Sequence, residues 1–173
     1  MITILDIETT SKGPGKSPSP FWPDNYLVSV GYKAEEDIEE YLCFNHSFKK
    51  ADPHARKILQ EQLDKTILLV GHNIGFDLQW LWECDFKYEK NVYDTMAYEY
   101  LFNGSMSTKL DLSSCCRRHG INSKLDLSQE LKDKNGFEHI SWEKVEKYGR
   151  NDVDITKQLF EAQLEELTNE EYY

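Results

Sequence analysis

Several features that mark other classes of protein are missing from this 173-residue chain. Its four cysteines form no Cys-x-x-Cys pair, which argues against a zinc site or a disulfide framework and favours free thiols in a reducing compartment. No apolar run approaches the roughly 18 residues of a membrane span, and the N-terminus lacks the charged start and long apolar core of a signal peptide. The sequence therefore predicts a cytoplasmic protein with no membrane partner.

Positive charge is also scarce. Lys and Arg number 20 against 31 Asp and Glu, so the formal net charge is −11. Because neutralising phosphates needs Lys and Arg, this balance argues against a non-specific coat on nucleic acid. An enzyme that meets phosphates through metal ions is not excluded. The aromatic content of 13% is too high for a disordered chain, and the length suits one domain over residues 1–173.

Hydrophobic patterning predicts an α/β domain with a mixed sheet of about five strands flanked by helices. Strands are expected at residues 2–6, 26–33, 40–44, 66–71 and 92–94, and helices at 52–63, 73–83, 95–102, 109–118 and 141–167. The first three strands are consecutive, which favours an antiparallel meander. The wholly apolar fourth strand is of the kind that is buried on both faces. The charged segment 124–135 indicates neither state.

Local signals mark several helix ends. Asp52 followed by Pro53 predicts an N-cap and a first helical position. Ser141 is expected to cap the last helix, and Gly120 suits a helix C-terminus. Gly149 lies inside the last helix, where glycine costs about 1 kcal/mol relative to alanine.

The first strand ends on two carboxylates, Asp6 and Glu8, separated by one residue. Burying such a strand with both acids uncompensated would cost several kcal/mol, and divalent cations are the usual compensation. The triplet Asp37-Ile38-Glu39 repeats the pattern but is typical of a solvated turn. The first pair therefore needs partners from elsewhere in the chain before it indicates a site.

Two helical pairs offer such partners. Asn73 and Asp77 are four residues apart, as are Tyr148 and Asp152, so each pair shares a helix face. Asp77 follows a buried strand in an apolar context, so it should be paired or bound to metal. Asp152 alone could equally be one charge on a solvated helix face. With 31 acidic residues in the chain, only the order and context of these patterns together are specific.

This ordered set resembles the three exonuclease motifs of the DEDD superfamily, which has a ribonuclease-H-like fold. The likeness is strongest to the 3′–5′ proofreading domain of family A DNA polymerases, including bacteriophage ones. The motifs are Asp6-Ile7-Glu8-Thr9, Gly71-His72-Asn73-Ile74-Gly75-Phe76-Asp77 and Tyr148-Gly149-Arg150-Asn151-Asp152. Between them, Asp94-Thr95-Met96 resembles the start of a helix in those domains. Tyr148 marks the tyrosine branch, since the histidine branch would have His where Lys147 stands.

The resemblance implies two Mg²⁺ or Mn²⁺ ions as cofactors. Asp6 would bridge both ions, Glu8 and Asp152 would complete the first site, and Asp77 would hold the second. Carboxylates are the hard oxygen ligands that both metals prefer. Two divalent ions about 3.5–4 Å apart can activate a water and stabilise the leaving oxygen of a phosphodiester.

The resemblance also implies roles at the substrate. The Tyr148 hydroxyl would orient the attacking water, because a free tyrosine pKa of about 10 makes it a poor base. Thr9 and Asn73 would contact the terminal nucleotide. His72 would either touch substrate or serve as a hydrogen-bonded structural histidine.

The implied activity is a metal-dependent 3′–5′ exonuclease that removes nucleoside 5′-monophosphates from single-stranded DNA. An exoribonuclease of the same branch, a nuclease-dead binding or scaffolding domain, and an acidic interaction module are the alternatives. A separate DNA polymerase is a candidate partner, and a phage-encoded protein would work in the host-cell cytoplasm.

The negative net charge predicts weak, salt-sensitive binding of nucleic acid. The candidate contacts to the strand are Lys12, Lys16, Arg117, Arg118 and Lys124. The apolar residue that usually wedges against the terminal bases after the first motif has no counterpart here, and Phe21 or Trp22 could replace it.

Overall fold

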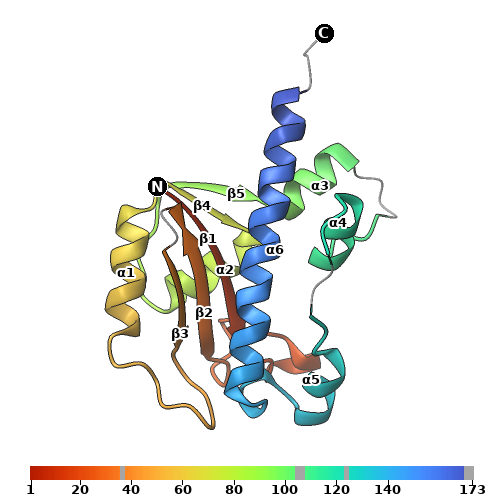
Figure 1. Ribbon diagram of the computed structural model, residues 1–173. Helices are drawn as coiled ribbons and strands as arrows, with labels where there is room; N and C mark the ends of the chain where they lie inside the picture. The colour runs from red at the N-terminus through yellow and green to blue at the C-terminus, as the bar shows by residue number, and fades with distance from the viewer. Residues whose placement is uncertain (36–37, 104–107, 123–124, 170–173) are drawn as a thin grey trace.

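The computed structural model describes residues 1–35, 38–103, 108–122 and 125–169 (Figure 1). Its strands are β1 (Ile2–Thr9), β2 (Leu27–Ala34), β3 (Glu39–Cys43), β4 (Leu68–Gly71) and β5 (Asn91–Asp94). Its α-helices are α1 (Ala55–Lys65), α2 (Ile74–Glu83), α3 (Thr95–Asn103), α4 (Leu112–Arg118), α5 (Ser128–Lys134) and α6 (Trp142–Asn169). The short 3₁₀ helices η1 (Pro14–Lys16) and η3 (Phe137–His139) lie in connecting segments. Within these residues, no helix is both long and apolar enough to cross a membrane.

The five strands form one mixed sheet in the order β3-β2-β1-β4-β5. β1, β2 and β3 pair antiparallel, and β4 joins β1 in parallel and is itself parallel to β5. The predicted α/β architecture and the predicted meander are therefore confirmed. β1 lies at the centre of the sheet, and its acidic end pairs with β2 beyond the last residue that pairs with β4.

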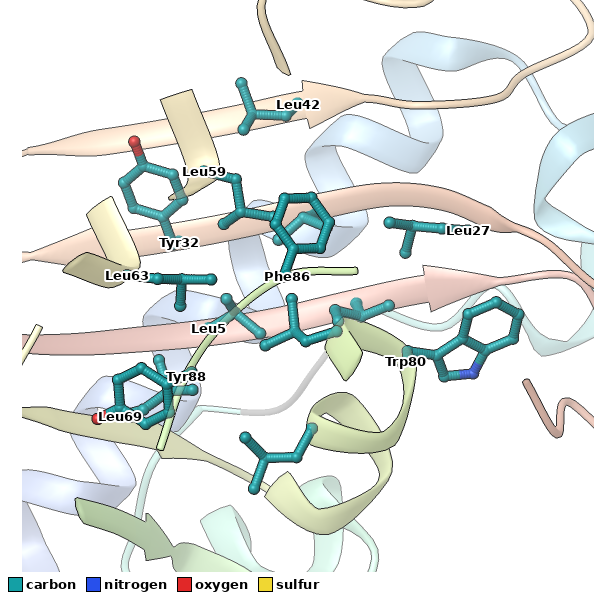
Figure 2. Close-up of a cluster of buried hydrophobic side chains, with 14 of the residues drawn as sticks. Leu5, Leu27, Tyr32, Leu42, Leu59, Leu63, Leu69, Trp80, Phe86 and Tyr88 are labelled. Atoms are coloured by element: carbon teal, nitrogen blue, oxygen red, sulfur yellow. The ribbon is translucent and has the colours of Figure 1, made fainter. Parts of the chain in front are cut away.

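Alternation along β1 sends its side chains to two different layers. Leu5 joins an apolar cluster with Leu59 and Leu63 of α1 and with residues of α2 (Figure 2). Ile4 faces the opposite way and packs with Val153 of α6. Successive strand residues point to opposite faces, so Asp6 and Glu8 share the α6 face with Ile4. In Figure 1, α6 runs across this face of the sheet, where it contacts β1, β2, β3 and β4.

The predicted start of α1 is wrong. The helix begins at Ala55 with His54 at the N-cap, and Asp52 does not cap it. Instead, an Asp52 carboxylate oxygen accepts a hydrogen bond from the backbone N–H of Cys43 at 2.8 Å. The Asp52 carboxylate was expected to accept from the first turn of the helix. It accepts from Cys43 instead, because the backbone N–H at the end of β3 also needs a hydrogen-bond partner.

Other boundaries shift by a few residues. α4 begins at Leu112, not 109, because the Asp111 side chain accepts from the backbone N–H of Ser114 at 3.0 Å and caps the helix there. This helix ends before Gly120, which has the expected left-handed φ of 69°. The ambiguous segment contains α5. The Asp37 of the second acidic triplet lies outside the described residues.

Gly149 is more than a weak point in α6, because a tyrosine ring from β3 occupies the space beside it. A Cβ atom built on Gly149 would lie 2.2 Å from the Tyr41 hydroxyl oxygen, and one on Gly31 would lie 2.8 Å from the same ring. The Tyr41 hydroxyl also donates to the carbonyl of Val145 in α6 at 3.2 Å and lies 2.9 Å from the Ser29 hydroxyl. Two glycines thus let α6 lie close against the sheet with Tyr41 between them.

This packing predicts the effect of Gly149→Ala. Alanine is the better helix former by about 1 kcal/mol, yet its methyl group would overlap Tyr41. We expect a net loss of about 1–3 kcal/mol in the free energy of unfolding, measured by urea denaturation. Gly75→Ala in α2 is the matched control, because no atom outside its local backbone lies within 4 Å of the added Cβ. Equal stability of the two variants would contradict this account of Gly149.

Candidate active site

Carboxylates from β1 and α6 converge where the helix crosses the strand. Among the described residues, Asp6, Glu8 and Asp152 each offer an oxygen, and these oxygens all lie within 4.8 Å of one another. Glu8 and Asp152 are buried, with exposed fractions of 7% and 3%. The pleat of β1 places both of its acids on the α6 face, and the close packing at Gly149 brings Asp152 to them. Two segments that are remote in the chain therefore form one acidic cluster.

Asp77 adds a fourth carboxylate beside this cluster. It lies in the first turn of α2, directly after β4, and is 4% exposed. Burial and the charges of Asp6 and Asp94 raise the pKa of Asp77 well above its ordinary value. Hydrogen bonds from backbone groups, including that of Ile7, act in the opposite direction. Asp6 is thus both a member of the three-carboxylate cluster and a charge that acts on Asp77.

The donor set fits divalent cations. Carboxylates that are buried together repel one another and lose hydration, so the charged forms are costly without compensation. Hard oxygen ligands are those that Mg²⁺ and Mn²⁺ prefer. Asp6 belongs to the three-carboxylate cluster and its charge also acts on Asp77, which suits a site with Asp6 as a shared ligand.

Tyr148 lies at the edge of the same cluster. Its side chain is 8% exposed and makes a hydrogen bond with that of Asp152, one turn further along α6. Burial, followed by the charges of Asp152, Glu8 and Asp6, raises the pKa of Tyr148 above its ordinary value. The hydroxyl therefore keeps its proton and can act as a hydrogen-bonding group. The Tyr148 ring packs at 5.7 Å against that of Phe137.

The three residues predicted to contact substrate lie around this cluster in different ways. Thr9 is buried at the end of β1, directly after Glu8, where the strand register shifts. Asn73 is exposed, with a left-handed φ of 62° at the N-terminus of α2. For His72, Nδ1 lies 2.9 Å from the Thr95 hydroxyl, and Nε2 donates to the Leu110 carbonyl at 2.7 Å. Their part in substrate binding stays a prediction.

Sequence reasoning missed two residues at this site, Tyr41 and Asp94. Burial and the charge of Glu8 raise the pKa of Tyr41 well above its ordinary value, which places it next to the cluster. An Asp94 carboxylate oxygen accepts from the backbone N–H groups of Asn73 and Met96, both at 2.9 Å, and so ties the start of α2 to the start of α3. The Asp-Thr-Met motif pointed to Asp94, whereas no local signal marked Tyr41.

Two of the predicted basic contacts are engaged with glutamates inside the protein. Lys12 Nζ lies 3.6 Å from a carboxylate oxygen of the buried Glu138. Arg118 holds the fully buried Glu99 at 2.6 Å and thereby joins α4 to α3. Both cations therefore have a structural role as partners of buried glutamates.

The other basic candidates are placed differently. Arg117 lines a pocket of about 520 Å³ that also has Tyr148 in its wall. Lys16 lines a second pocket, with Thr9. Lys124 lies outside the described residues.

Phe21 and Trp22, the predicted substitutes for a terminal-base wedge, lie between η1 and β2. Their exposed fractions are 66% and 37%. Both are accessible to a ligand, and their role as a wedge stays a prediction.

Comparison with solved structures shows the same fold in known nucleases and polymerases. NrnC from Brucella melitensis with bound Mg²⁺ is 18% identical, with a TM-score of 0.65 over 96% of this chain and 73% of that chain. NrnC bound to pGG gives a TM-score of 0.66 at the same identity and coverage. The family B DNA polymerase from the hyperthermophilic archaeon Pyrobaculum calidifontis is 16% identical, with a TM-score of 0.67 over 94% of this chain but 24% of that one. At these identities the likeness concerns the fold.

The family is shown by a sequence model described as 3′–5′ exonuclease (DNA_pol_A_exo1), which matches residues 20–168. That range includes the second and third motifs and begins after Asp6 and Glu8, which the fold brings to the same site. The match covers most of the chain and agrees with the predicted DEDD exonuclease and its ribonuclease-H-like fold. This chain belongs to the 3′–5′ exonuclease family.

Proposed function

We propose that this protein is a metal-dependent 3′–5′ exonuclease that removes nucleoside 5′-monophosphates from single-stranded DNA. The observation that carries the proposal is the convergence of Asp6, Glu8 and Asp152, with Asp77 beside them. Such a cluster needs cations for its own stability, and cations held there would face a phosphodiester. We further propose that residues 1–173 act as one domain in the cytoplasm.

Each residue of the cluster has a defined part in this proposal. Asp6 would hold both Mg²⁺ or Mn²⁺ ions, Glu8 and Asp152 the first, and Asp77 the second. When bound, the ions supply an activated water and a stabilised leaving oxygen. Tyr148 orients that water through its hydroxyl, which Asp152 positions by a hydrogen bond.

Residues at the rim would hold the 3′ end. Thr9 follows Glu8 directly, and Asn73 is exposed one turn before Asp77. Both can bind the sugar or base of the terminal nucleotide by hydrogen bonds. Holding the reacting phosphate in line with the attacking water makes a bimolecular step effectively unimolecular. This positioning supplies a large part of the rate gain in such reactions.

DNA and RNA remain the two candidate substrates. The likeness of the motifs to polymerase proofreading domains favours DNA, and a DNA polymerase acting in trans would be the matching partner. The fold shared with NrnC, which has been solved with pGG, supports RNA as the alternative. DNA and RNA differ at the 2′-hydroxyl of the sugar, and the residues of the three motifs do not show whether the site accepts that hydroxyl.

The substrate is decided by one experiment. The protein is incubated with 5′-labelled single-stranded DNA or RNA in Mg²⁺, Mn²⁺ or EDTA. We expect a ladder that shortens from the 3′ end on DNA, in either metal and not in EDTA. A ladder on RNA alone would replace the proposed substrate, and no cleavage of either polymer would overturn the proposed function.

Asp152→Asn should abolish hydrolysis while keeping the shape of the side chain. Loss of one metal ligand removes several kcal/mol of transition-state stabilisation, so we expect a fall in kcat of roughly a thousand-fold or more. Mg²⁺ should raise the melting temperature of the wild type and not of the variant, because a ligand that binds only the native state stabilises it. Both quantities are measured on the same preparations.

Asp154→Asn is the matched control. Asp154 lies two residues further along α6, but its carboxylate pairs with Lys33 at 2.8 Å and belongs to no metal cluster in the described structure. This variant should retain both activity and the Mg²⁺-dependent rise in melting temperature. Comparable turnover in Asp152→Asn and Asp154→Asn would remove Asp152 from the site.

Tyr148→Phe tests the hydroxyl alone. If it orients the water, kcat should fall about 100-fold while KM changes little, because the contact acts in the transition state. The Mg²⁺-dependent stabilisation should persist, since the carboxylates are intact. Tyr93→Phe is the control, because the buried Tyr93 hydroxyl has no hydrogen-bond partner in the described structure. Equal kcat in the two variants would contradict the role of Tyr148.

A further inference from the structure

A pocket of about 230 Å³ lies beside the acidic cluster. Its wall includes Thr9 at the end of β1, Lys16 from η1, Lys132 and Asn135 from the α5 region, and Phe137 of η3. Figure 1 shows α5 beside the segment that connects β1 to β2. Thr9 follows the cluster residue Glu8, and the Phe137 ring packs on Tyr148. The pocket therefore opens next to the proposed catalytic residues.

The two lysines of this pocket are available to a ligand. Within the part of the chain that the structure describes, no carboxylate oxygen lies within 4.0 Å of the amino group of Lys16 or Lys132. By contrast, Lys12 pairs with Glu138 and Lys144 pairs with Glu130, whereas Lys134 on the same helix has no such partner among the described residues. The buried Glu138 directly follows the wall residue Phe137, and the side-chain nitrogens of Lys12 and His139 each lie 3.6 Å from its carboxylate. An acidic protein thus keeps two unneutralised cations in one pocket.

The backbone holds Lys16 in an unusual conformation. Its φ is 61°, directly after Gly15 at 66°, and Asn135, which also lines the pocket, has a φ of 60°. Asparagine tolerates the left-handed region, whereas the conformation is unfavourable for a lysine. Strain of this kind persists where surrounding structure enforces it and is concentrated at binding sites. Here it occurs at a lysine that lines the same pocket as Lys132.

We infer that the Lys16–Lys132 pocket binds a phosphate of the substrate strand on the 5′ side of the scissile bond. The inference rests on the proposed exonuclease function. The departing 3′-terminal nucleotide carries the scissile phosphate as its own 5′-monophosphate and has a free 3′-hydroxyl. Every other phosphate of the substrate therefore lies on the 5′ side. Two lysines that line one pocket with Thr9 supply the charge that such a phosphate needs.

The ligand is a phosphate monoester or diester, and short substrates separate the two sources. The substrates are a dinucleotide without a 5′-phosphate, the same dinucleotide with a 5′-phosphate, and an unphosphorylated trinucleotide. The first has only its scissile phosphate, the second adds a terminal phosphate, and the third adds an internucleotide phosphate. Initial rates are compared for the wild type and for Lys16→Gln/Lys132→Gln, on whichever polymer the wild type degrades.

We expect the double variant to raise KM about 10-fold for a substrate with a second phosphate, at nearly unchanged kcat, because a charge-assisted contact is lost. For the unphosphorylated dinucleotide the KM should be unchanged. An increase for the 5′-phosphorylated dinucleotide, the trinucleotide or both supports the subsite and identifies the source. On a longer strand, log KM should depend less steeply on log salt, by about 0.7 for the one phosphate no longer neutralised.

Lys134→Gln is the matched control, since Lys134 is exposed on the same helix and lines a different pocket. Lys132→Gln alone serves as a second variant, because its exposed position on α5 cannot disturb the left-handed turn at Lys16. Equal KM ratios for all three substrates, or the same effect from Lys134→Gln, would overturn the subsite while leaving the exonuclease intact. Absence of any cleavage by the wild type would instead overturn the proposed function.

Discussion

The close approach of α6 to the sheet is the constraint on which the acidic cluster depends. Gly149 in the helix and Gly31 in β2 leave space that the Tyr41 ring fills, and the Tyr41 hydroxyl bonds to both layers. A larger residue at either glycine would push the helix away from the strands. Because Tyr148 and Asp152 flank this contact on α6, their distance from Asp6 and Glu8 is set by it. The packing of Tyr41 thus helps to position the α6 residues of the acidic cluster.

Electrostatics then separates the charged groups by role. Carboxylates are concentrated in a buried cluster, where burial and mutual repulsion raise the pKa of Asp77. Several surface cations are neutralised by glutamates, as Arg118 is by Glu99 and Lys12 by Glu138. The net charge of −11 therefore does not show how the charges are distributed between the buried cluster and the surface ion pairs. In the proposals above, phosphate would be bound by metal ions in the cluster and by Lys16 and Lys132, which have no carboxylate partner among the described residues.

The parts of the site that could be predicted from sequence are those in which a motif lies on one element. Asp6 and Glu8 were assigned to the end of a buried strand, and Asp77 and Asp152 to helices that follow the expected order. The start of α1 was wrong, because Asp52 bonds to the backbone of Cys43 instead. Local propensity could not reveal this competition, since the competing donor belongs to another element.

The sequence by itself determined the identity and order of the acids, the alternation that puts Asp6 and Glu8 on one face, and the family. Those properties are local, or are carried by motifs that can be read along the chain. Only the tertiary structure decided that Tyr41 supports the helix and that Lys16 and Lys132 share a pocket. These relations join residues from separate elements, and their geometry follows from packing distances and backbone conformations that no short pattern encodes.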